Sequence, residues 1–89
     1  NVWLRIYDGY IPSWLKNIKI EGSFICSHNK LTSLENCPQY VGKDFLCGHN
    51  ELTSLEDCPK YIGSNFWCYY NKEKLELPEG VEVKGNFFN

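Results

Sequence analysis

The sequence predicts a mainly β protein: a short repeat solenoid with a parallel sheet of about five strands on one face and turns on the other. Two observations lead to this prediction. Residues 25–47 and 46–68 read ICSHNKLTSLENCPQYVGKDFLC and LCGHNELTSLEDCPKYIGSNFWC, so the second stretch repeats the first, with Cys47 in the place of Cys26. Apolar residues alternate with other residues where each repeat begins, which is typical of a strand with one buried face. Because one coil of this length cannot bury its own apolar side, successive coils are expected to stack.

The composition favours one small domain. The chain has 89 residues, of which 43% are hydrophobic, and this is enough for a single core. Its net charge is -2, and its Lys and Arg residues are scattered, so direct nucleic-acid binding is not expected. The sequence contains no apolar run of membrane-spanning length and no signal peptide. We therefore expect a cytoplasmic protein that does not contact a membrane.

Residues 1–22 are predicted to form an N-terminal cap and the first coil. Leu4 and Ile6 are aligned with Phe24 and Cys26, the apolar strand positions of the next coil, which places Arg5 in the outward column. The stretch IPSWLKNI, residues 11–18, predicts one short capping helix, because Pro and Ser suit a helix start and apolar residues follow at helical spacing. We expect Trp3 or Trp14 to close the core at this end.

Three repeats and a terminal strand follow, at 23–43, 44–64, 65–85 and 86–89. Each repeat begins with the pattern F-x-C-x-x-N-x-L-x-x-L. The third copy degrades after its Asn, because Glu73 occupies a leucine position and Leu75 and Leu77 come late in the repeat. The predicted strands lie near 2–7, 23–27, 44–48, 65–69 and 86–88.

Cysteine and asparagine recur at fixed positions of the repeat. Thiols that keep the repeat phase are typical of small buried apolar residues. Reduced core thiols are therefore the first interpretation, with disulfides second and a metal site third, since the chain has no C-x-x-C pair. Asn at a fixed position after each strand is expected to be a buried amide that binds the backbone of neighbouring turns. These residues are Cys26, Cys47, Cys68, Cys37, Cys58, Asn29, Asn50 and Asn71.

The pattern L-x-L-x-x-N-x-L is similar to the leucine-rich repeat, here with Phe and Cys in the strand positions. The tail LPEGVEVKGNF, residues 77–87, resembles the short bacterial and bacteriophage variety, and the units NKLTSLENCP and NELTSLEDCP resemble small repeat proteins encoded by phages. The resemblance implies a right-handed solenoid. It also implies a small viral protein that binds a host factor, such as an immune nuclease, and inhibits or redirects it in the host cytoplasm, as an anti-CRISPR protein does.

The repeat does not assemble a catalytic site. His28 and His49 share one phase, which predicts a surface column beside the turns, and two ligands make a poor metal site. The in-phase cysteines are expected to face the core while these histidines face solvent. The sequence also lacks a Gly-rich phosphate loop and a nucleophile elbow. It therefore predicts a protein that is not an enzyme and has no cofactor, metal or small-molecule substrate.

The positions at which the copies differ predict the functional surface. The core holds the inward positions constant, so differences gather on the outward face of the sheet, where one column is almost entirely apolar. Strands about 4.8 Å apart would align this column into a stripe roughly 14 Å long. Such a stripe, rimmed by Asp44, Asn65 and Lys72, is expected to bind a protein partner. The predicted partner-binding residues are Arg5, Tyr7, Ile25, Leu46, Trp67, Tyr69, Tyr70 and Phe88.

Three alternatives stay open. The aromatic side chains of the stripe can instead cover one another or pack on the N-terminal segment. The final strand can pair with its symmetry mate in a homodimer, with Val83, Phe87 and Phe88 at the edge. A column of carboxylates can mimic DNA, although nine basic residues dilute its field. The column consists of Glu35, Glu56, Glu76 and the neighbouring Asp57.

Overall fold

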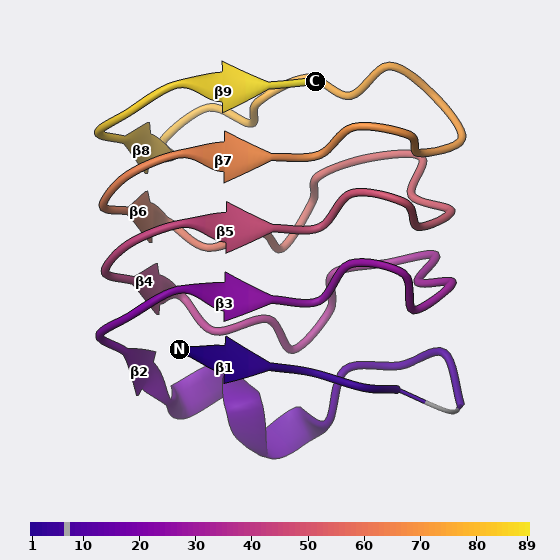
Figure 1. The fold of residues 1–89 in the computed structure, drawn as a ribbon, viewed down its shortest axis with the longest axis horizontal. Coiled ribbons are helices and arrows are strands. Elements are labelled where there is room, and N and C mark those ends of the chain that lie inside the picture. Colours follow the sequence, from indigo (N-terminus) through magenta and orange to yellow (C-terminus); the bar gives the residue numbers. More distant parts are fainter. Residues whose placement is uncertain (7) are drawn as a thin grey trace.

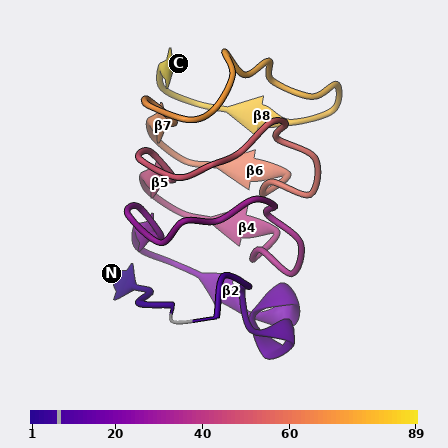
Figure 2. The same ribbon diagram turned by 90° about the vertical axis from the view of Figure 1, so that its right-hand side faces the viewer.

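The computed structural model describes residues 1–6 and 8–89 and shows a mainly β solenoid (Figure 1). Its coils stack along one axis, with the two termini at opposite ends (Figure 2), and its strands form two parallel sheets. The five-stranded sheet has the order β1-β3-β5-β7-β9, and the four-stranded sheet has the order β2-β4-β6-β8. The five-stranded sheet consists of β1 (Val2–Trp3), β3 (Phe24–Ile25), β5 (Phe45–Leu46), β7 (Phe66–Trp67) and β9 (Phe87–Phe88). The four-stranded sheet consists of β2 (Lys19–Ile20), β4 (Tyr40–Val41), β6 (Tyr61–Ile62) and β8 (Glu82–Val83).

The five-stranded sheet holds the repeats in register. Phe24 pairs with Phe45, and Phe66 pairs with both Phe45 and Phe87, as the repeat predicts. Phe24, Phe45 and Phe66 are fully buried. Their ring centroids lie 6.0 Å and 5.0 Å apart, so the aromatic rings form a continuous column inside the solenoid. The predicted sheet of about five strands is confirmed. Each strand is as short as Phe45–Leu46.

The first coil is displaced from its predicted alignment. Val2, and not Leu4, pairs with Phe24, and Trp3 pairs with Ile25, so the predicted alignment was wrong. Because side chains alternate with a period of two, both alignments turn the same residues inward, and the apolar pattern does not separate them. The observed alignment allows the Ser23 N–H to donate a hydrogen bond to Asn1 Oδ1, at 3.0 Å. Trp3, and not Arg5, therefore lies beside Ile25 in the outward column.

The helical turn predicted over 11–18 is a 3-10 helix, η1 (Ser13–Asn17), beside the first coil (Figure 1). Leu15 anchors it in the core. Trp14 and Trp3 are 65% and 78% exposed, so the prediction that one of them closes the core was wrong. A 3-10 helix turns more tightly than an α-helix, so its side chains do not follow the α-helical spacing on which the prediction was based. The predicted capping α-helix is therefore not observed. In the part of the chain that the structure describes, no helix is long and apolar enough to cross a membrane.

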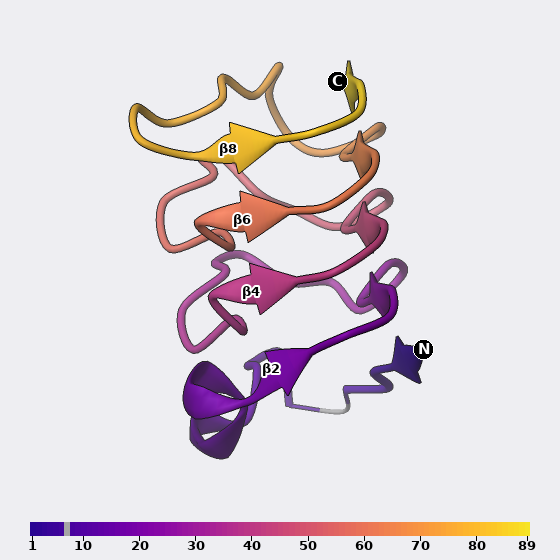
Figure 3. The ribbon, with the colours of Figure 1, turned by 90° about the vertical axis from the view of Figure 1, so that its left-hand side faces the viewer.

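A second sheet occupies the part of each coil that was predicted as turns (Figure 3). Val41 and Ile62 point into the core and are fully buried. Tyr40 and Tyr61 lie on the outside, and their rings stack with centroids 4.9 Å apart. Val83 belongs to this sheet, so the single final strand predicted from Val83 onward is divided between the two sheets.

Two glycines keep the corner between the sheets tight. A Cβ atom at Gly63 would overlap the carbonyl oxygen of Gly42 on the preceding coil. A Cβ atom at Gly42 would overlap the carbonyl oxygen of Glu21 in the same way. The Gly63 N–H meanwhile donates to the Val41 carbonyl oxygen at 2.9 Å. Only glycine allows the backbones of successive coils to approach this closely.

The asparagine that follows each strand binds the backbone of two coils, as predicted. The buried Asn50 accepts hydrogen bonds through Oδ1 from the N–H groups of Asn29 and Leu31, at 2.9 Å and 3.0 Å. Its Nδ2 donates to the carbonyl oxygens of Cys26 and Cys47, at 3.1 Å and 3.0 Å. The amide thereby satisfies polar groups that the turn would otherwise leave unpaired inside the protein.

Candidate functional site

The outer face of the five-stranded sheet carries a column of large apolar side chains. In-register pairing places one such residue on every coil. Strands about 4.8 Å apart bring these side chains into contact along the solenoid axis. The rings of Trp67 and Phe88 stack with centroids 4.1 Å apart. We call this set the outer column, and it consists of Trp3, Ile25, Leu46, Trp67 and Phe88.

A second column of rings stands beside it, where each coil leaves the sheet. His28, His49 and Tyr70 adopt positive φ angles of 61°, 54° and 60°. This left-handed conformation is uncommon for residues other than glycine. The centroids of His28 and His49 lie 4.3 Å apart, and those of His49 and Tyr70 lie 4.6 Å apart. The predicted histidine column is confirmed, and Tyr70 extends it by one coil.

A hollow of about 330 Å³ lies between the two columns. Ser27, which has a small side chain, and Gly48, which has none, line the hollow. Tyr69 lies at the equivalent position one coil further. The two columns supply the remaining lining residues. We call this hollow the aromatic groove, and it is lined by Trp3, Ile25, Ser27, His28, Leu46, Gly48, His49, Trp67, Tyr69 and Tyr70.

The aromatic groove has exposed side chains at both ends, and His28 and His49 between them are exposed as well. Trp3 is 78% exposed and Tyr70 is 74% exposed. Ile25, Leu46 and Trp67 between them are half-buried. These inner side chains therefore do cover one another in part, as one of the alternatives expected. Even so, the exposed rings together with the half-buried floor leave a continuous apolar surface.

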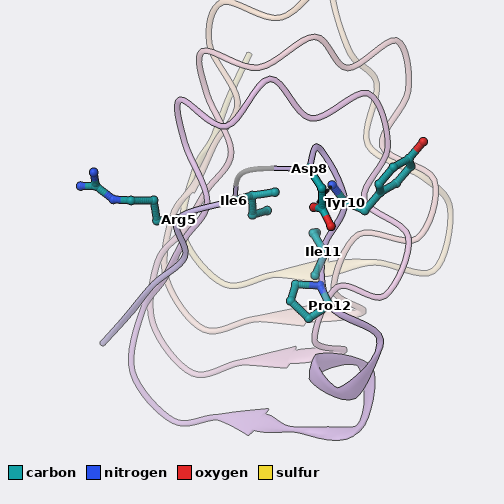
Figure 4. Close-up of a pocket in the computed structure, with 6 residues that line it drawn as sticks. All are labelled: Arg5, Ile6, Asp8, Tyr10, Ile11 and Pro12. Atoms are coloured by element: carbon teal, nitrogen blue, oxygen red, sulfur yellow. Dashed lines mark hydrogen bonds between the residues drawn. The ribbon is translucent and has the colours of Figure 1, made fainter.

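Arg5 lies at the end of the groove formed by the first coil. It lines a hollow of about 450 Å³ together with Trp3, Ser27 and His28. Figure 4 shows a second hollow on the other side of this segment, where the Arg5 side chain extends away from Asp8. Arg5 is exposed and lines both hollows, one of them beside the groove residues Trp3 and His28. Tyr7, the other predicted partner-binding residue of this coil, lies outside the described residues.

The predicted rim residues Asp44 and Asn65 make hydrogen bonds between coils. Asp44 Oδ1 accepts a hydrogen bond from the Asn65 N–H at 2.9 Å. Asn65 Oδ1 accepts one from the Asn86 N–H, also at 2.9 Å. Ser23 Oγ makes the corresponding bond to the Asp44 N–H at 3.1 Å. These side chains form a polar ladder between coils, and neither Asp44 nor Asn65 is among the described residues that line the groove, whereas Lys72 is exposed.

The predicted dimer edge is split by the two sheets. Phe87 and Phe88 form β9 at one edge of the five-stranded sheet, whereas Val83 belongs to β8 in the four-stranded sheet. All three side chains are half-buried. Phe88 contributes to the outer column, while Phe87 packs against the core. The three residues therefore do not form one edge strand.

The five cysteines are free and buried. Burial raises the pKa of Cys26 to about 12 and raises the pKa values of Cys58 and Cys68 to about 11. It also raises the pKa values of Cys37 and Cys47 well above the ordinary range. At neutral pH the thiols stay protonated in the core, and a protonated buried thiol is a poor nucleophile and a poor metal ligand. Among the described residues no group of three or more metal-ligating side chains is found.

Among the described residues, the Asp8 carboxylate lies near the first-coil end of the groove, because it shares neighbouring hollows with Arg5 and with His28. None of the described residues that line the groove itself is an Asp or a Glu. The carboxylates of the predicted acidic column, Glu35, Glu56, Glu76 and Asp57, are all exposed. The groove is thus an apolar surface with the Arg5 guanidinium at one end, although the chain as a whole carries a net charge of -2.

Comparison with known proteins gives no match: no protein-family model, no curated protein and no solved structure is significantly similar to this chain. The conclusions about function therefore rest on the geometry of the aromatic groove.

Proposed function

We propose that this protein is a non-catalytic binding module that holds a protein partner in the aromatic groove. The observation that supports this is the continuous row of aromatic and aliphatic side chains across four coils, with Trp3 and Tyr70 largely exposed. Exposed apolar surface of this kind is costly in water and usually marks an interaction site. Trp and Tyr are also the residues that contribute most to binding energy at protein interfaces.

Two further features support a binding role. The groove is built on a sheet whose backbone hydrogen bonds run between coils, which holds the rings in place before a partner arrives. The five buried free thiols suit a reducing compartment such as the cytoplasm. The resemblance to phage-encoded repeat proteins makes a host-cell protein, with inhibition or redirection as the outcome, the first partner class to test.

The test compares two double variants, each of which replaces one exposed Trp and one exposed Tyr with Asp. Trp3→Asp with Tyr70→Asp removes two exposed rings from the groove. Trp14→Asp with Tyr10→Asp removes two exposed rings elsewhere on the surface. All four side chains are largely exposed, so both variants are expected to keep the circular dichroism spectrum and the melting temperature of the parent chain.

Each protein is then used for affinity purification from a bacterial lysate, followed by mass spectrometry. We expect at least one protein to be retained by the parent chain and by the Trp14/Tyr10 variant, and to be lost with the Trp3/Tyr70 variant. Retention of the same proteins by both variants would show that the groove is not the binding surface.

A further inference from the structure

We propose that the aromatic groove recognises a proline-rich segment in the polyproline II conformation, with an acidic residue placed to reach Arg5. This inference rests on the proposed function and specifies the chemistry of the partner. It follows from the spacing of the coils, from the hydrogen-bonding groups that the groove presents, and from the charge at one end of it.

The spacing of the coils matches the repeat of a polyproline II helix. Neighbouring coils are about 4.8 Å apart, so two steps along the groove cover about 9.6 Å. One turn of polyproline II contains three residues and rises about 9.3 Å. A side chain that recurs every third residue therefore meets an equivalent position of the groove at every second coil. The distance from Trp3 to Tyr70, three coil steps, accommodates about four or five residues of such a segment.

The groove offers side-chain donors, and the backbone of its inner coils is already paired. The backbone groups beneath it are used between coils: the Cys26 N–H donates to the Leu46 carbonyl oxygen at 2.9 Å, and the Cys47 N–H donates to the Trp67 carbonyl oxygen at 2.8 Å. A ligand lying on this face is therefore unable to join the sheet as an extra strand. Polyproline II leaves all of its carbonyl oxygens unpaired, and the indole N–H groups of tryptophan donate to such oxygens.

The shape of the groove also suits proline rings. The stacked rings of His28 and His49 on one side, and the aliphatic side chains of Ile25 and Leu46 on the other, flank Ser27 and Gly48, with Trp3 and Trp67 further along the groove. Gly48 is buried, and a Cβ atom there would lie 2.9 Å from the Tyr69 carbonyl oxygen, so packing of the coils keeps this position open. A rigid proline-rich segment loses little conformational entropy on binding, and aromatic-lined grooves are the usual surfaces that hold one.

The charge at the end of the groove favours an acidic residue in the ligand. Arg5 adjoins Trp3 and His28, and no carboxylate is among the described residues lining these two hollows. Asp8 lines a neighbouring hollow with Arg5, but the Arg5 side chain extends away from it (Figure 4). An Asp or Glu next to the proline-rich segment would pair with the Arg5 guanidinium. A nucleic-acid ligand is disfavoured on the same ground, because stacking bases needs a basic track for the phosphates and the groove carries one Arg.

The test is a selection from displayed random peptides, long enough to span the groove, with the whole chain as bait. Peptides that bind the parent chain and the Trp14/Tyr10 variant, and that fail to bind the Trp3/Tyr70 variant, are retained and sequenced. We expect prolines at every third position with an adjacent Asp or Glu. For a synthetic peptide from this set, replacing the prolines with Ala should weaken binding at least about tenfold.

Exchanging the charges of Arg5 and of the acidic peptide residue tests the orientation of the peptide in the groove. Arg5→Glu should weaken the same peptide, and replacing the acidic residue of the peptide with Lys should restore its binding to that variant. Groove-dependent peptides without the proline spacing would overturn the inference and leave the proposed function intact. If no peptide distinguishes the Trp3/Tyr70 variant from the Trp14/Tyr10 variant, the inference also fails; the lysate capture then decides the proposed function separately.

Discussion

At the scale of single residues, Asn50 shows how one amide fastens two coils together. It accepts two backbone hydrogen bonds and donates to the Cys26 and Cys47 carbonyl oxygens. Asn50→Ala leaves the N–H groups of Asn29 and Leu31 without this acceptor, whereas the two carbonyl oxygens keep the Nδ2 donors of Asn29 and Asn71. We expect the free energy of unfolding to fall by about 3 kcal/mol, because an unpaired buried group costs about 1–3 kcal/mol. Urea denaturation measures this change. Asn17→Ala, at an exposed site, serves as the control and should change it by less than about 0.5 kcal/mol. An equal loss in both variants would contradict the role assigned to the buried amide.

The cysteines predict a loss of stability at high pH. Burial raises the pKa of Cys26 to about 12, whereas the ordinary thiol value is 9.0. Above pH 9 the unfolded chain releases this proton while the folded chain keeps it, so the free energy of unfolding falls as the pH rises from 9 towards 12. Below pH 9 both states keep the proton and the contribution is fully present.

The measurement is the free energy of unfolding of the parent chain and of Cys26→Ala between about pH 8 and about pH 11. Other groups that titrate in this range, such as Lys and Tyr, are the same in both proteins. We expect the difference between the two curves to shrink as the pH rises, because the variant lacks the buried thiol. Parallel curves would mean that Cys26 ionises equally easily in both states.

The sequence predicts residue roles well where one residue type keeps one phase. The asparagine amides and the core thiols lie as expected for that reason. The ladder of Ser23, Asp44 and Asn65 was not recognised, because three different residue types share its position and the variation looked like a binding rim. Any short side chain with an oxygen atom accepts the same backbone N–H, so the fold fixes the chemical group and not the residue.

At the scale of elements, the corner between the two sheets depends on glycine. A Cβ atom at Gly63 would overlap the carbonyl oxygen of Gly42. Because backbone surrounds the site, the neighbouring coil has to move, and we expect Gly63→Ala to lower the free energy of unfolding by at least about 2 kcal/mol. Ser64→Ala, the next position along the chain, is the matched control and should have little effect. Thermal melts of both variants check this, and an unchanged melting temperature for Gly63→Ala would refute the close approach.

The four-stranded sheet was the element that sequence reasoning missed. Tyr40-Val41 and Tyr61-Ile62 belong to segments that were predicted as turns, because so short a pair cannot show alternation. The available signal was their recurrence in the same phase with one outward ring and one inward aliphatic side chain. The alignment of the first coil failed for a related reason, since a shift by one full period of the strand preserves which side chains face inward.

At the scale of the whole molecule, the sequence predicted that a binding face would be aromatic but not that it would be a groove. Ile25, Leu46 and Trp67 could be placed in one column from the period alone. The hollow has two causes. The left-handed turns place a second column of rings beside the outer column, and the small residues Ser27 and Gly48 lie between the two columns. Positive φ at a histidine or tyrosine leaves no mark in the composition of the repeat.

The in-register stacking of coils is tested most directly by nuclear Overhauser contacts from the Ile25 side chain. The structure predicts cross-peaks from Ile25 methyl groups to the indole of Trp3 on one side and to Leu46 methyl groups on the other, and from Leu46 to the indole of Trp67. Cross-peaks from Ile25 to Arg5 in place of Trp3 would restore the alignment of Leu4 with Phe24. If neither Trp3 nor Leu46 gave a contact to Ile25, the coils would not be stacked in register, and the groove would not exist.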